Sequence, residues 1–225
     1  MKTKHPAAPV LDDARLATAW QAASLLLGYP DEDLLGRLPV LRRALRGLPA
    51  PVAGPLGGVL DHLETTSPQV LAADYVTTFD QRKRSCPYLT YFACGDTRKR
   101  GMALLRFKQT YDAAGLVLDG ELPDHLAVVL EFAATGDLAE GRRLLLEHRA
   151  GLELLRLALT EAGSPWTGVL DAVSATLPPL TGDISRDVAR LVAEGPPEEQ
   201  VGLAPYGAAS GPVLLPDPVL LEARS

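Results

Sequence analysis

Residues 75–134 read YVTTFDQRKRSCPYLTYFACGDTRKRGMALLRFKQTYDAAGLVLDGELPDHLAVVLEFAA and decide how the rest of the chain is interpreted. They include most of the aromatic residues of an aromatic-poor chain, both cysteines, and two basic runs at 82–84 and 98–100. The stretch closes on a Pro-Asp-His step, residues 123–125, that precedes an apolar run. No other segment combines so many packing residues with so many chemically reactive ones.

The composition around this stretch favours helices. The chain has 225 residues, 47% of them hydrophobic, which is enough for one substantial core. Leu, Ala and Val supply most of the apolar residues, and Ile184 is the single isoleucine. Because Leu and Ala favour helix, whereas strands prefer β-branched and aromatic residues, the sequence predicts an all-α fold with a single globular helical domain.

On the N-terminal side of the stretch, the first helix is predicted at residues 12–27. A second begins at the acidic residues 31–33 and is expected to break near Pro39. The Pro/Gly-rich segment 47–58 is expected to be a connection, followed by a helix at 59–65. Another helix starts at Pro68, and its ridge consists of Leu71, Tyr75 and Phe79.

Within and beyond the stretch, residues 80–94 show no helical period and are expected to form a long connection. A helix capped by Asp96 or Thr97 is predicted to end at Gly115, and Pro123 is expected at the first position of the next helix. The leucine heptad within 137–162 fits either one helix or two. Two further helices are predicted at 164–176 and 183–194. The buried stripe of the helix that ends at Gly115 is expected to be Leu104, Phe107, Tyr111 and Ala114.

The chain divides into a loose arm at 1–11, a helical domain at 12–195 and a Pro/Gly-rich tail at 196–225 that is expected to be mobile. Its formal charge of −6 argues against a nucleic-acid partner. The sequence contains no run of apolar residues long enough for a transmembrane helix and no apolar signal-peptide core. We therefore expect a cytoplasmic protein that is not an integral membrane protein.

Each chemically suggestive feature has a structural and a functional interpretation. Tyr75 and Phe79, four residues apart, are typical of a core but also suit a groove for an amphipathic helix. The basic runs are typical of a solvated surface, or of one that binds an anionic partner. Cys86 and Cys94 lack the spacing and further ligands of a metal site, so no metal is expected.

Glu121, Asp124 and His125 form the last candidate cluster. They are either a helix-start motif that holds the preceding loop, or a site in which neutral His125 binds a backbone or acts as a base. His148 lies on the leucine stripe and is interpreted as a core histidine. Since the sequence shows no activated nucleophile at a meaningful spacing, we expect that the protein is not an enzyme.

At these residues the sequence closely resembles the NarJ-type nitrate reductase assembly chaperones of the TorD/DmsD group of redox-enzyme maturation proteins. The resemblance covers about residues 12–195 and rests on YLTY (88–91), GDTRKRGMALLRFK (95–108), ELPDHL (121–126) and the segment from Tyr75 through Phe79 to Asp80. It implies an all-helical, TorD-like chaperone that holds the N-terminal segment of the nitrate reductase catalytic subunit until molybdenum cofactor and iron–sulfur clusters are inserted, before membrane docking.

Carried over by position, the resemblance implies that the client peptide is bound by nine residues: Tyr75, Phe79, Tyr88, Tyr91, Arg98, Arg100, Glu121, Asp124 and His125. The implied partners are the catalytic (alpha) subunit and the proteins that deliver the molybdenum cofactor. The chaperone itself would hold no cofactor and would not remain in the finished enzyme. Two alternatives stay open: a carrier that binds the molybdenum cofactor or a nucleotide near Gly95, and a hydrolase built on His125 or Cys86.

Overall fold

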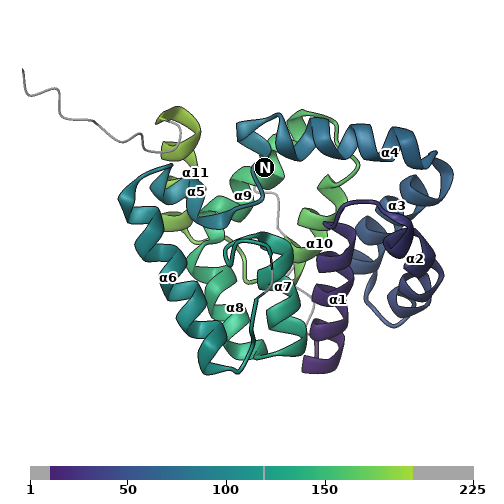
Figure 1. Cartoon of the computed structure of the whole chain (residues 1–225), viewed down its shortest axis with the longest axis horizontal. Helices are drawn as coiled ribbons and strands as arrows, with labels where there is room; N and C mark the ends of the chain where they lie inside the picture. Colours follow the sequence, from purple (N-terminus) through teal and green to yellow (C-terminus); the bar gives the residue numbers. More distant parts are fainter. Residues whose placement is uncertain (1–10, 119, 195–225) are drawn as a thin grey trace, which may run out of the picture.

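The computed structural model describes residues 11–118 and 120–194, and this part of the chain is helical (Figure 1). The all-α prediction is confirmed: the described residues form eleven α-helices, one π-helical turn and one 3₁₀ turn, and no strand. The arm predicted at 1–11, apart from its last residue, and the tail predicted at 196–225 lie outside the described residues. The α-helices are α1 (Asp13–Leu26), α2 (Glu32–Leu45), α3 (Ala50–Thr65), α4 (Pro68–Tyr75), α5 (Leu89–Cys94), α6 (Arg98–Ala113), α7 (Leu126–Thr135), α8 (Leu138–Glu147), α9 (Arg149–Glu161), α10 (Thr167–Thr176) and α11 (Gly182–Glu194).

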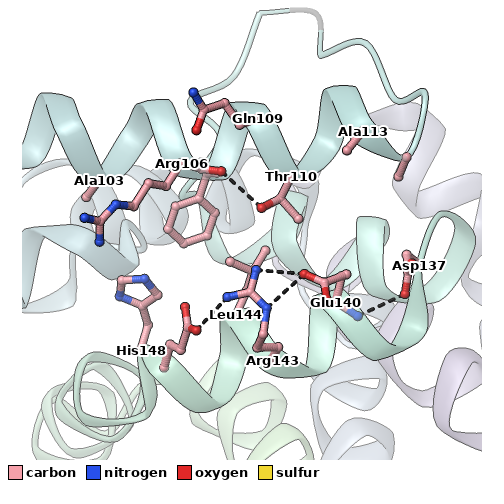
Figure 2. A pocket seen from close by; sticks show the side chains of 13 residues that line it. Ala103, Arg106, Gln109, Thr110, Ala113, Asp137, Glu140, Arg143, Leu144 and His148 are labelled. Carbon is pink, nitrogen blue, oxygen red and sulfur yellow. Dashed lines mark hydrogen bonds and ion pairs between the residues drawn. The ribbon is translucent and has the colours of Figure 1, made fainter.

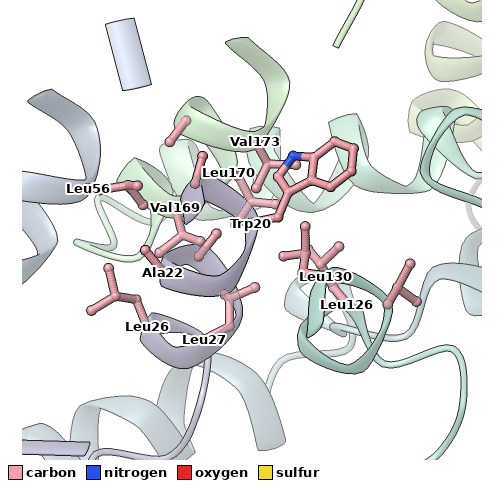
Figure 3. Close-up of a cluster of buried hydrophobic side chains, with 14 of the residues drawn as sticks. Trp20, Ala22, Leu26, Leu27, Leu56, Leu126, Leu130, Val169, Leu170 and Val173 are labelled. Atoms are coloured by element: carbon pink, nitrogen blue, oxygen red, sulfur yellow. The ribbon is translucent and has the colours of Figure 1, made fainter. Parts of the chain in front are cut away.

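Helix α1 lies at the centre of the core, between α7 and α10 (Figures 1 and 3). Asp12 begins it by accepting a hydrogen bond from the backbone N–H of Arg15 at 2.8 Å. Trp20 is fully buried, and its indole N–H donates to the hydroxyl of Thr176 in α10 at 2.9 Å. On the side of α7, the hydroxyl of Ser24 donates to the carbonyl of Ala127 at 2.7 Å. Polar anchors within an apolar core thus fix α1 against both neighbours.

Two predictions about the N-terminal half are wrong. Helix α2 does not break at Pro39 but continues to Leu45, and α3 begins at Ala50, so most of the segment 47–58 that was expected to be a connection is helical. In both cases burial of a leucine-rich stripe outweighs the helix-breaking tendency of Pro and Gly. The buried residues are Leu34, Leu38, Leu41 and Leu45 in α2, and Val52, Leu56, Val59, Leu60 and Leu63 in α3.

A glycine allows α3 and α10 to approach closely. A Cβ atom built on Gly168 would lie 2.5 Å from the carbonyl oxygen of Pro55 and 2.9 Å from the Val59 side chain. Gly141 has the same role between α8 and α7, because a Cβ there would lie 2.3 Å from that of Ala133. The glycines of this chain therefore set helix separations as well as turns.

The leucine heptad is divided between α8 and α9, which meet at His148. A further correction concerns residues 80–94, which contain the 3₁₀ turn η2 (Lys83–Ser85) and α5 rather than a plain connection. The predicted stripe of α6 is only partly buried: Phe107 and Tyr111 are enclosed, whereas Ala114 is exposed. Helix α6 therefore presents most of its surface outward.

Candidate functional site

A pocket of about 380 Å³ opens where four segments meet. The end of α1 supplies one wall, the turn after α4 a second, the residues before α5 a third, and the start of α7 with the loop before it a fourth. The lining residues are Leu27, Gly28, Tyr29, Tyr75, Phe79, Asp80, Pro87, Tyr88, Glu121, His125, Ala127, Val128 and Glu131. We call this cavity the aromatic pocket, because four of its lining side chains are Tyr or Phe.

The aromatic wall comes from the ridge predicted from the sequence. Leu71 is buried in the core, whereas Tyr75 and Phe79 both pack on the core and line the pocket. Their rings are 4.8 Å apart, and each ring centroid lies 5.7 Å from that of the buried Trp166. The core interpretation and the groove interpretation of this ridge are therefore compatible.

A π-helical turn, η1 (Val76–Asp80), continues α4 and carries Phe79 and Asp80 into the pocket. Such turns are rare and occur often at functional sites. The Tyr75 hydroxyl donates to the carbonyl oxygen of Leu27 at 2.9 Å, which ties this turn to the end of α1. Burial raises the pKa of the Tyr75 phenol far above its usual value, so this hydroxyl stays protonated.

Two loops are joined behind the pocket. The N–H of Leu89 donates to the carbonyl of Asp124 at 3.0 Å, and the N–H of Leu126 donates to that of Pro87 at 2.9 Å. This short antiparallel bridge pairs Tyr88 with His125. The loop before α5 and the loop before α7 therefore position each other.

Asp124 is fully buried at this junction. One carboxylate oxygen accepts a hydrogen bond from the hydroxyl of Thr90 at 2.5 Å and another from its backbone N–H at 3.2 Å. The Arg100 guanidinium lies 3.9 Å from the same oxygen and also pairs with Asp96 at 2.9 Å. The prediction that Pro123 begins α7 is wrong, because a turn ending in this buried carboxylate comes first and the helix begins at Leu126.

His125 caps α7 and faces the pocket. Its Nδ1 accepts a hydrogen bond from the N–H of Ala127 at 3.2 Å, so the ring carries its proton on Nε2. Burial lowers the pKa of His125, although the carboxylates of Glu121 and Asp124 act in the opposite direction. The helix-start interpretation of the Glu121–Asp124–His125 cluster is therefore supported by the geometry, with a neutral imidazole.

Tyr88 stands at the rim of the pocket. Its hydroxyl donates to the carboxylate of Glu121 at 3.0 Å, and its ring lies 5.2 Å from that of His125. The Arg100 guanidinium lies behind the ring, 5.4 Å from its centroid. Partial burial, with a contribution from Glu121, raises the pKa of Tyr88 to about 12. The phenol therefore remains a neutral hydrogen-bond donor at physiological pH.

The pocket has a negative polar rim. Asp80, Glu121 and Glu131 are exposed carboxylates, and none of the described lining residues is Lys or Arg. Aromatic faces add to the attraction for cations. The arrangement favours a ligand that combines apolar side chains with positive charge.

The structure brings together five of the nine predicted site residues: Tyr75, Phe79, Tyr88, Glu121 and His125. The other four predicted residues do not line the pocket. Arg100 and Asp124 lie behind it, 3.9 Å apart. Tyr91 packs on Phe92 within α5, and Arg98 is exposed at the start of α6. Sequence analysis missed Tyr29 and Glu131. Tyr29 lies between Gly28 and Pro30, a sequence typical of a helix end, and Glu131 belongs to no motif, so neither carries a local signal for a binding site.

A second cavity, of about 740 Å³, lies between α6 and α8 (Figure 2). The charged wall on the α8 side is already internally paired, because Arg143 bridges Glu140 at 2.7 Å and Glu147 at 2.6 Å, whereas Arg106 on the α6 side forms no ion pair with a described residue. His148 lies against Phe107, with ring centroids 5.0 Å apart, and burial lowers its pKa. None of the nine predicted residues lines this cavity, and we take the aromatic pocket as the candidate site.

The described residues also bear on three further questions from the sequence: a metal site, the cap of α6, and a membrane span. Within 11–118 and 120–194, no group of three or more His, Cys, Asp or Glu side chains could hold a metal ion. The Thr97 hydroxyl donates to the carbonyl of Cys94 at 2.8 Å rather than capping α6. Among the helices that the structure describes, none has both the length and the hydrophobicity needed to span a bilayer.

Comparison with known proteins gives concordant results. The family described as "Nitrate reductase delta subunit" matches residues 45–172. The chain is 45% identical to the nitrate reductase-like protein NarX of Mycobacterium tuberculosis over 70% of its own length, but that match spans only 24% of NarX. It is 32% identical to NarJ of Bacillus subtilis, over 70% of this chain and 87% of that protein.

Two further relatives extend the comparison. The nitrate reductase molybdenum cofactor assembly chaperone NarJ of Escherichia coli is 32% identical over 66% of this chain and 64% of that protein. A solved structure of a redox enzyme maturation protein from Archaeoglobus fulgidus superposes with a TM-score of 0.54, at 24% identity, over 76% of this chain and 97% of that one. This last likeness shows the fold.

Proposed function

From the premise that this chain belongs to the nitrate reductase delta subunit family, we propose that it is the assembly chaperone of a respiratory nitrate reductase. In this proposal it binds the N-terminal segment of the catalytic subunit in the aromatic pocket. It holds that segment in the cytoplasm while molybdenum cofactor and iron–sulfur clusters are inserted, and it is not part of the finished enzyme. The relatives named as chaperones place the chain in a non-catalytic family, which sets the hydrolase alternative aside.

The observation that carries the proposal is the chemistry of the pocket lining. Four aromatic rings offer apolar contact area, and three exposed carboxylates surround them without a described Lys or Arg. An amphipathic helix with basic residues beside an apolar face would satisfy both features. Its apolar face would pack on the aromatic rings and provide affinity, and its basic residues would pair with the carboxylates and fix its position along the pocket. Tyr29 is 49% exposed and stands over Tyr75, where a ligand can cover it.

The test is calorimetric titration with a synthetic peptide from the N-terminus of the catalytic subunit. Tyr29→Ala should weaken binding by roughly tenfold or more, since exposed aromatic residues at the centre of a pocket dominate binding energy. Glu131→Gln should weaken it less and should reduce its salt dependence. Glu140→Gln, in the cavity between α6 and α8, is the matched control and should bind as the wild type does.

Two outcomes would contradict this proposal. If the peptide does not bind at high micromolar concentration, the cofactor-carrier alternative gains weight. If Glu140→Gln weakens binding while Tyr29→Ala does not, the peptide occupies the other cavity. Folding of each variant is checked by its helical circular dichroism.

A further inference from the structure

Helix α6 concentrates positive charge on a chain that is acidic as a whole. It contains five Lys or Arg residues and one Asp, although the formal charge of the chain is −6. Arg100 is turned inward to Asp96 and Asp124. The other four cations form no ion pair with any residue that the structure describes: Arg98, Lys99, Arg106 and Lys108.

Two large apolar side chains lie among these charges. Met102 is 61% exposed and Leu105 is 46% exposed. At helical spacing they share one outward stripe with Arg98 and Gln109. Lys99 and Arg106 flank it on one side, and Lys108 flanks it on the other, beside the single acidic residue of the helix, Asp112. Phe107 and Tyr111 mark the opposite, buried face of the same helix. Figure 1 shows α6 along the edge of the molecule.

Stability does not explain this arrangement. Arg98 and Lys99 lie in the first turn, where positive charge opposes the helix dipole. Met102 and Leu105 leave a large part of their apolar surface in water, where it adds nothing to the stability of the isolated chain. A face that is unfavourable in the isolated protein and complementary to an anionic apolar surface indicates a partner of that chemistry.

We propose that the outer face of α6 binds the anionic surface of a lipid bilayer. An apolar stripe between rows of Lys and Arg is the arrangement of helices that lie in the membrane interface, with long cationic side chains reaching the headgroups. Met102 and Leu105 line neither of the two cavities described above. Around Met102 and Leu105 the face offers charge and exposed apolar area but no described recess, although Arg106 and Gln109 at its border line the cavity between α6 and α8. A flat apolar stripe of this kind suits a fluid surface better than a protein helix.

The proposed membrane face and the aromatic pocket lie on different sides of α6. Arg100, on the inner side, contacts the Tyr88 ring at the pocket rim, whereas Met102 and Leu105 project outward. A chain bound through its outer face would keep the pocket accessible. Membrane binding and peptide binding are therefore separable, and either can fail without the other.

The test is co-sedimentation of the full chain with vesicles. Binding is expected to equimolar phosphatidylglycerol–phosphatidylcholine vesicles at low salt, to weaken as salt screens the charges, and to be absent with pure phosphatidylcholine. The triple variant Lys99→Ser/Arg106→Ser/Lys108→Ser should reduce partitioning by about fivefold for each charge removed. Met102→Ser/Leu105→Ser should also reduce it, since the apolar stripe is lost.

The matched control removes three exposed cations from α2 and the residue that follows it, as Arg37→Ser/Arg43→Ser/Arg46→Ser, with the same change in net charge. It should bind vesicles as the wild type does. Equal loss in the α2 control would show non-specific charge attraction and overturn the proposal, as would wild-type chain that stays in the supernatant with anionic vesicles. Binding that depends on the α6 cations but occurs only with an acidic protein would also overturn it. Helical circular dichroism and urea unfolding of the α6 variants check that the fold persists, independently of whether the client peptide binds.

Discussion

The hydroxyl of Thr90 and the carboxylate of Asp124, 34 residues apart in sequence, form a 2.5 Å hydrogen bond in a fully buried environment. This contact joins the start of α5 to the turn before α7. Both walls that Tyr88 and His125 contribute to the aromatic pocket depend on that junction. The buried pair therefore links stability to the shape of the site.

Removing this contact should destabilise the fold. Thr90→Val preserves side-chain shape but leaves the carboxylate with one partner fewer, and should cost about 1.5–3 kcal/mol of the free energy of unfolding. Asp124→Ala should cost at least as much, and the double variant should cost less than the two single variants together. Urea unfolding measures all three. Thr160→Val, at an exposed hydroxyl of α9, should change stability by less than about 0.5 kcal/mol, and additivity of the two buried substitutions would contradict the coupling.

Stability should fall as the pH is lowered below neutrality. Burial lowers the pKa values of His125 and His148 from the ordinary value of 6.5, so the unfolded chain takes up protons before the folded one does. The stabilisation is complete above pH 6.5 and is lost as the pH falls toward the folded-state values. Urea unfolding at several pH values between about 5 and 8 measures the slope.

His125→Asn separates the two histidines, because Asn accepts the same capping hydrogen bond without titrating in this range. The variant should show a shallower pH dependence than the wild type, with the remainder due to His148. An unchanged slope would show that protonation of His125 is not linked to folding.

The buried ion pair between Arg149 and Glu153 should be costly to break by removing one partner. The two side chains are 4% and 2% exposed and lie 2.9 Å apart, and the Glu153 carboxylate also accepts from Ser174 of α10 at 2.7 Å. Glu153→Gln leaves a buried guanidinium without its counter-charge and should cost about 3–5 kcal/mol. Glu140→Gln breaks an exposed pair with Arg143 and should cost at most about 1 kcal/mol. Equal losses in thermal or urea unfolding would refute the distinction.

The α3–α10 contact should not tolerate a single added methyl group. Gly168→Ala would drive a Cβ atom into the Pro55 carbonyl and should cost roughly 1–3 kcal/mol or more through forced separation of the helices. Gly58→Ala, in α3, meets no atom within 4 Å and should instead stabilise the protein by about 0.5–1 kcal/mol. Opposite signs in the unfolding free energy are the expected result, and a neutral Gly168→Ala would show that the interface can relax.

Local signals predicted much of this fold. Asp12 begins α1, Pro68 begins α4, and the ridge through Tyr75 and Phe79 packs as its spacing indicates. These features depend on neighbours three or four residues away, which the sequence displays directly. The predictions of a helix break at Pro39 and of a connection at 47–58 are wrong for the same reason. Both segments bury apolar residues between α2 and α3, and that burial is not visible from either segment alone.

The candidate site was only partly predictable. Tyr75, Tyr88 and His125 fall within recognisable motifs, whereas Tyr29 and Glu131 reach the pocket because α1 and α7 pack side by side. Likewise, Arg149 and Glu153 interrupt an apolar helix in sequence, and only the approach of Ser174 explains how they are accommodated. Residues brought together by tertiary packing carry no local signal of their association.

The π-helical turn at Val76–Asp80 has a consequence for how the pocket can vary among related chains. Such a turn contains one residue more than the α-helical turn it replaces, and each residue advances a helix by about 100°. Phe79 and Asp80 therefore face the cavity because the extra residue rotates them around the helix axis. A chain one residue shorter here would rotate the same side chains away from it, so ligand preference could change through a single deletion without altering any residue that lines the pocket.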